Sequence, residues 1–110
     1  MQLRFLGHSG IQLNSVSFNL VIDPFLTGNP TATVKTESLS PQHIILAHAH
    51  GDHSADVEPL AKRTGALIIS NAEIAGYYGT KGLKAHGMNT GGSFTFPFGK
   101  LTFTPAWHSS

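Results

Sequence analysis

The chain has 110 residues, a net charge of +1 and no cysteine. This length allows a single domain, and the lack of cysteine excludes disulfides, thiolate metal sites and cysteine nucleophiles. The sequence has no basic run that would favour nucleic acid as a partner, and no apolar run near the ~20 residues of a membrane-spanning helix.

The first part of the chain is predicted to be mostly β-structure. Strands are expected over residues 2–6, 11–13 and 18–22. Asp23-Pro24 ends the third strand, because proline cannot donate to a β-ladder. Residues 25–41 have little periodicity and are predicted to form a long loop, of the kind that often serves as a lid or a site wall.

The second part alternates strands with helices. The strands are predicted at residues 43–47, 66–70 and 83–86, followed by a hairpin of residues 94–96 and 101–103. One helix is expected to begin after an N-cap at Asp56 and to end at Gly65, and a shorter helix should begin after Asn71. The first three strands have no crossover helices, so the order predicts an α+β fold: a mixed β-sheet with helices on one face.

Three histidines and an aspartate, His48, His50, Asp52 and His53, follow directly after the predicted strand 43–47. Imidazole and carboxylate are the ligands expected for zinc and related divalent metals. Alternate residues of an extended segment point the same way, so His48 and His50 can bind one ion together. After a turn at Gly51, Asp52 and His53 can reach the same ion or a second one. Four ligands on one ion would make a closed structural site, whereas two per ion leave positions open for catalysis.

The spacing His-x-His-x-Asp-His after an apolar strand resembles the signature of the metallo-β-lactamase fold superfamily. Asp23, which closes a buried strand, and His108, which follows the hairpin, resemble two further motifs of that superfamily. Four segments are similar to one branch, the metal-dependent hydrolases related to ascorbate-6-phosphate lactonase: residues 7–9, 22–25, 87–92 and 106–110.

This resemblance implies an αββα metallo-β-lactamase-type sandwich, of which residues 1–110 would form one domain half, the N-terminal one. It implies that His48, His50 and His108 bind a first ion and that Asp52 and His53 bind a second. Asp23 would support the histidine loop through hydrogen bonds. The ions would be divalent, zinc or manganese, with nickel and iron also compatible with these ligands.

The expected function is that of a cytoplasmic, metal-dependent hydrolase in which a metal-bound hydroxide attacks an ester, lactone or phosphodiester bond. Asp52 would orient or deprotonate the water, and His8 could touch the substrate or that water, although a packing role for His8 is equally open. The alternative is a non-catalytic metal-binding fragment. A lost fold on metal removal would indicate the structural role, and lost turnover in a folded His50→Ala variant the catalytic one.

Three other aromatic residues are expected to have structural roles outside the metal site. His43 should be a solvated strand start, His86 an exposed loop residue, and Trp107 part of the core.

The expected partners are a small-molecule substrate and the C-terminal half of the fold, present as a separate chain or as a cleaved segment, unless the chain is a shortened form. A homo-oligomer is also compatible with the sequence. No nucleic acid and no membrane is expected as a partner.

A half domain leaves one sheet face exposed, which favours aggregation. We therefore predict that the chain purified alone is insoluble or self-associated. Analytical ultracentrifugation checks this, and a monodisperse monomer at millimolar concentration would contradict it.

Overall fold

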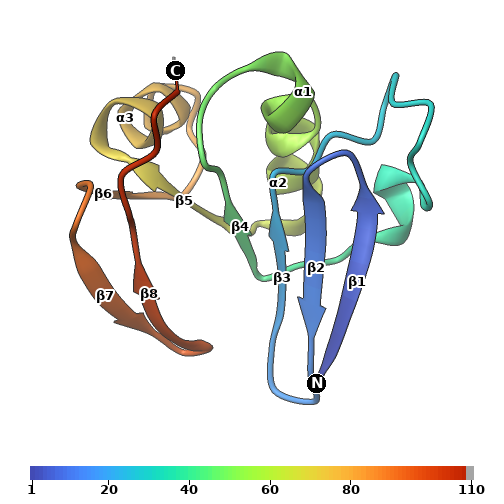
Figure 1. The fold of residues 1–110 in the computed structure, drawn as a ribbon, viewed down its shortest axis with the longest axis horizontal. Coiled ribbons are helices and arrows are strands. Elements are labelled where there is room, and N and C mark those ends of the chain that lie inside the picture. Colours follow the sequence, from blue (N-terminus) through green and yellow to red (C-terminus); the bar gives the residue numbers. More distant parts are fainter. Residues whose placement is uncertain (109–110) are drawn as a thin grey trace.

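The computed structural model describes residues 1–108. Ser109 and Ser110, the last two residues of the segment 106–110, lie outside the described residues. Six strands form one sheet in chain order (Figure 1). They are β1 (Gln2–Gly7), β2 (Gly10–Asn14), β3 (Asn19–Ile22), β4 (His43–Ile45), β5 (Leu67–Asn71) and β6 (Ala85–Met88).

The sheet is mixed. β1, β2 and β3 are antiparallel neighbours, whereas β3, β4, β5 and β6 run parallel to one another. The connections carry a short 3-10 turn, η1 (Thr36–Ser38), and three helices, α1 (Gly51–Ser54), α2 (Val57–Thr64) and α3 (Ala72–Thr80). A hairpin of β7 (Ser93–Phe96) and β8 (Gly99–Thr102) forms a separate two-stranded sheet.

Each face of the sheet has its own core. One cluster joins sheet residues such as Val21, Ile44 and Ile68 to helix residues such as Leu60 and Ile74. The other joins Leu20, Ile45, Ile69 and Met88 to Phe96 of the hairpin. Helices therefore cover one face and the hairpin lies on the other, which confirms the predicted mixed sheet with helices on one face.

Most predicted elements are present with shifted ends. Gly65 closes α2 in a left-handed conformation, and the Asn71 side chain accepts a hydrogen bond from Ile74 N–H at the start of α3. β4 is shorter than predicted, ending at Ile45, and β6 begins two residues later than predicted. Residues 51–54 form a helical turn rather than an open loop.

Asp56 occupies the predicted N-cap position of α2, but its side chain does not cap the helix. Its buried carboxylate instead accepts hydrogen bonds from Leu26 N–H at 2.6 Å, Thr27 N–H at 2.8 Å and the Thr27 hydroxyl at 2.6 Å. Asp56 therefore ties the start of α2 to the loop after β3, which a local capping rule cannot foresee.

The expectations for three other residues need correction. His43 begins β4 as predicted, but it is not solvated. His43 is half-buried, with its ring 4.9 Å from that of Phe98, and burial lowers its pKa. His86 lies on β6, half-buried, with its ring 4.4 Å from that of Phe94. The hairpin packs its aromatic rings over both histidines. Trp107 is fully exposed instead of buried, because His108, and not the indole, meets the histidine loop.

The hairpin leaves the β1 end of its sheet face uncovered. Leu3 and Phe5 are 68% and 56% exposed, and their cross-strand neighbours Leu13 and Ile11 are half-buried. Soluble proteins rarely leave an apolar strand face this exposed to solvent. Within residues 1–108, no helix is long and apolar enough to cross a membrane.

We predict that Asp56→Ala lowers the free energy of unfolding by about 1–3 kcal/mol, because it leaves buried backbone donors without their charged acceptor. Urea denaturation of the natural gene product that carries these residues measures this. The matched control is Glu58→Ala, which removes a neighbouring carboxylate from surface ion pairs with Lys62 and Lys81 and should change the free energy of unfolding much less than Asp56→Ala does.

The effect of Asp56 should depend on pH. Burial alone would raise the pKa of Asp56, but hydrogen bonds from Thr27 and Leu26 outweigh it, and the pKa lies below its usual value. A carboxyl group of this kind stabilises the fold above its unfolded pKa of about 4 and loses that contribution as the pH falls toward its folded pKa. The stability difference between the wild type and Asp56→Ala should be full at neutral pH and shrink below about pH 4; a difference that stays constant would contradict this account.

Candidate metal centre

The candidate site lies at the carboxyl ends of the parallel strands, a usual place for chemistry in sheets of this kind. Asp23 follows β3 and the histidine loop follows β4, and the two strands pair directly, with Ile22 opposite Ile45. At the end of β5, the buried Ser70 hydroxyl donates to Leu46 C=O at 2.8 Å. Three neighbouring strand ends thus hold the backbone that enters the loop.

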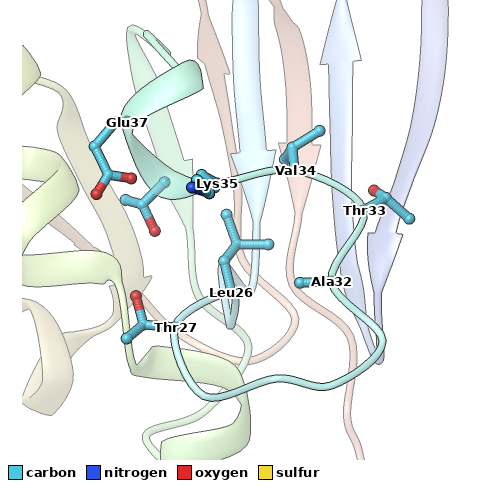
Figure 2. A pocket seen from close by; sticks show the side chains of 8 residues that line it. Leu26, Thr27, Ala32, Thr33, Val34, Lys35 and Glu37 are labelled. Carbon is cyan, nitrogen blue, oxygen red and sulfur yellow. The ribbon is translucent and has the colours of Figure 1, made fainter.

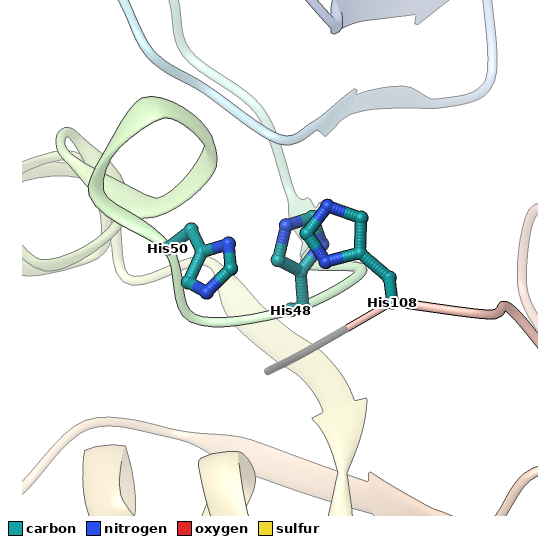
Figure 3. Close-up of side chains that lie close together, drawn as sticks. All are labelled: His48, His50 and His108. Carbon is teal, nitrogen blue, oxygen red and sulfur yellow. The ribbon is translucent and has the colours of Figure 1, made fainter.

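The first group of side chains is His48, His50 and His108 (Figure 3). One ring nitrogen from each lies within 4.8 Å of the other two. The ring centroids of His48 and His108 are 4.5 Å apart, and those of His50 and His108 are 5.1 Å apart. Residues 60 positions apart in the chain, His48 and His108, therefore meet in one place.

The environment of His48 fits a metal ligand. Its Nε2 is buried and has no hydrogen-bond partner among the described residues. Such orphaned buried atoms are rare in folded proteins and call for an explanation. Burial first, and then the neighbouring imidazoles, lower the pKa of His48. A neutral imidazole with an unused lone pair is the form that binds a divalent metal.

The second group is His8, Asp52 and His53, whose ligand atoms also lie within 4.8 Å of one another. His53 Nδ1 lies 2.9 Å from Asp23 Oδ2, and Asp23 Oδ1 accepts from Ala47 N–H at 2.8 Å. A carboxylate can only accept, so His53 donates from Nδ1 and keeps the Nε2 lone pair. That Nε2 faces Asp52 Oδ1 across 3.9 Å.

The two groups are adjacent. The ring centroids of His48 and His53 are only 4.1 Å apart, so one member of each group touches the other. The pKa of Asp52 lies below its usual value, because His53 and the hydrogen bond from His8 outweigh the opposing effect of burial. The arrangement therefore offers two neighbouring sets of imidazole and carboxylate ligands.

The long loop of residues 25–41 meets this site at its start, where the Phe25 ring lies 5.7 Å from that of His8. Further along, the loop lines an open pocket of about 600 Å³ (Figure 2). Its lining, residues 26–27 and 32–37, includes no member of either group. A second hollow of about 450 Å³ is bordered by Ala49, which lies between His48 and His50, and by Asn89 and Thr90 after β6.

All seven site residues predicted from the sequence lie at this edge of the sheet: His8, Asp23, His48, His50, Asp52, His53 and His108, the last of them on the segment after β8. Sequence reasoning missed two supporting hydroxyls. Ser70 gave one signal, a polar residue ending an apolar run. Ser54, which donates to the carbonyls of Ala49 and His50, gave none.

Paired imidazole and carboxylate sets on this mixed sheet define a metal-binding class of protein. The chain belongs to the Metallo-beta-lactamase superfamily, whose family profile matches residues 11–107. It is 47% identical to a UPF0173 metal-dependent hydrolase of Flavobacterium johnsoniae and 46% identical to one of an Exiguobacterium species, in each case over the whole chain. The inferred resemblance to the metal-dependent hydrolases of this superfamily is confirmed.

A solved structure gives the same result for the fold. Igni18, a metallo hydrolase from the archaeon Ignicoccus hospitalis, superposes with a TM-score of 0.90 at 32% identity, covering 98% of this chain and 49% of that one. An isothiocyanate hydrolase from Delia radicum gut bacteria shares the fold, with a TM-score of 0.65 at 19% identity, over 87% of this chain and 44% of its own. The chain spans about half the length of the curated relatives it matches, 49% of the two named above.

We predict that Asp23→Asn weakens metal binding by about 10–100-fold. Asparagine tolerates the left-handed backbone of residue 23 (φ 49°) and can still accept from Ala47 N–H. Its amide NH₂ would then face His53, which moves the imidazole proton to Nε2 and removes the lone pair that faces Asp52. Metal titration measures the affinity, and ¹⁵N chemical shifts of His53 report the tautomer. Unchanged affinity with Nδ1 still protonated would contradict the assignment.

Proposed function

We propose that this chain supplies metal ligands to a two-metal hydrolase. The observation that carries the proposal is the pair of adjacent ligand groups, one of which contains the buried, partnerless Nε2 of His48. The names of the relatives, metal-dependent hydrolases, support the same reaction class.

Each residue has a distinct part in this proposal. His48, His50 and His108 hold the first ion, and Asp52 and His53 hold the second. Asp23 fixes the tautomer of His53 and the course of the loop at Ala47. When bound, a divalent metal lowers the pKa of a coordinated water and stabilises negative charge on a carbonyl or phosphoryl oxygen. Zinc and manganese suit this donor set, and nickel and iron are compatible with it.

The bond cleaved is proposed to be an ester, a lactone or a phosphodiester. All three develop oxyanion charge during hydrolysis, which two adjacent cations stabilise. The hollow beside Ala49, which lies between His48 and His50, is bordered by the polar residues Asn71, Glu73, Asn89 and Thr90. We expect the part of a small-molecule substrate that lies away from the cleaved bond to bind in this hollow.

The proposal includes a protein partner. The relatives are about twice as long as this chain, and the sheet face at Leu3 and Phe5 is apolar and open. A C-terminal segment of the same fold, in the same polypeptide or in a second one, would bury this face and add walls to the site.

The test is His50→Ala in the natural gene product that carries these residues. The His50 side chain makes no hydrogen bond in the part of the chain that the structure describes, so the fold should persist. We expect a loss of metal from the first group and a fall in turnover of more than about 100-fold. Loss of a residue that only hydrogen-bonds to a metal ligand typically costs about 10–100-fold, and loss of a ligand itself should cost more. Turnover is measured on nitrophenyl esters, a γ-lactone and bis(p-nitrophenyl) phosphate, and metal content by elemental analysis.

The control is Glu58→Ala, which removes a carboxylate on α2 that lies outside both groups. It should leave metal content and turnover near those of the wild type. If chelation unfolds the protein and no substrate of the panel is hydrolysed, the site is structural, and the hydrolase proposal is wrong.

A further inference from the structure

Two residues other than glycine have positive φ angles within residues 1–108: His8, at 55°, and Asp23, at 49°. Left-handed backbone is uncommon outside glycine, and such outliers gather at functional sites. Both side chains contact the second ligand group. Asp23 hydrogen-bonds to His53, and His8 Nε2 lies 3.1 Å from Asp52 Oδ2.

The rest of the fold enforces the conformation at His8. Gly7 has a φ of 102°, and a Cβ on it would lie 2.6 Å from the carbonyl oxygen of Thr31. The loop is held there by two hydrogen bonds from Thr33, one to Leu6 C=O and one to Phe5 C=O. The tight turn between β1 and β2 is therefore pressed against the long loop, and it presents His8 to a residue 44 positions away.

The His8 ring is held from two sides. It makes edge contacts with the rings of Phe25, at 5.7 Å, and His53, at 5.5 Å. Because a carboxylate only accepts, the contact with Asp52 requires a proton on His8 Nε2. The two carboxylate oxygens of Asp52 thus have different neighbours: Oδ2 receives His8, and Oδ1 faces His53 Nε2 at 3.9 Å.

We propose that His8 is a positioning residue for the second metal. It donates from Nε2 to Asp52 Oδ2 and leaves Oδ1 as the single oxygen for the ion, in the same way that Asp23 orients His53. The inference rests on the proposed two-metal function and assigns to His8 a role through Asp52 rather than contact with the reacting atoms. The competing arrangement has His8 Nε2 bind the ion directly, which would require that nitrogen to lose the proton that it shares with Asp52.

The experiment is a metal titration of the natural gene product with Co²⁺, whose visible spectrum reports the ligand set at each site. His8→Asn keeps a residue type that tolerates positive φ, but its amide is too short to reach Asp52. His8→Gln places an amide donor near the position of Nε2. Glu58→Gln, on α2 and outside both groups, is the control, and circular dichroism verifies folding of each variant.

If His8 positions Asp52, His8→Asn weakens binding of the second ion by about 10–100-fold, leaves the first ion bound as in the wild type, and gives the wild-type Co²⁺ spectrum at saturation. His8→Gln restores most of the affinity. A changed spectrum at saturation that His8→Gln does not restore would show direct ligation and overturn the inference.

Second-ion affinity within twofold of the wild type in His8→Asn would also overturn the inference, while leaving the two-metal proposal in place. A wild-type protein that binds fewer than two ions would instead remove the proposed function itself, and the role of His8 with it.

Discussion

The candidate metal centre is organised around one buried carboxylate, that of Asp23. One of its oxygens accepts a hydrogen bond from Ala47 N–H and the other accepts one from His53. Asp23 therefore fixes the backbone just before the histidine loop and the side chain of the last histidine in it. Its position follows from the sheet. β3 and β4 are parallel neighbours in fixed register, and Asp23 N–H itself donates to Ile45 C=O at 2.9 Å. A one-residue slip of β3 would turn Asp23 to the opposite face and leave the loop without its anchor.

The same edge of the sheet collects the remaining residues from distant segments. His8 arrives from the turn between β1 and β2, and the Ser70 hydroxyl arrives from the end of β5. Each of these contacts is polar, and it lies at a strand end whose position is set by apolar packing on the sheet faces. Apolar burial is non-directional, whereas hydrogen bonds and imidazole orientation are directional. The core therefore brings the segments together, and the polar contacts set the angles that a metal needs.

The part of this site that the sequence could predict is the part encoded at short range. The alternation of His48 and His50, the break at Gly51 and the strand before them are local patterns, and the fold class follows from the order of such patterns. The pairing of His8 with Asp52 spans 44 positions, and no spacing rule reaches it. Asp56 shows the opposite error, since a local capping rule applies to its position, yet tertiary donors from Leu26 and Thr27 compete successfully for its carboxylate. His43 and His86 look solvated in the sequence because the aromatic hairpin that covers them comes later in the chain.

The hairpin also couples the core to the first ligand group. His108 follows β8, so its place is set by how the hairpin packs, with Phe96 buried against the sheet beside Ile45 and Ile69. Two backbone hydrogen bonds, from Gly91 N–H to Phe103 C=O and from Phe103 N–H to Gly92 C=O, tie the end of the hairpin to the loop after β6. An ion shared by His48, His50 and His108 would bind only the arrangement in which the hairpin is docked. A bound ion would therefore stabilise the docked hairpin, and a docked hairpin would raise the affinity for the ion by the same free energy. The apolar hairpin face and the metal are thus two parts of one equilibrium.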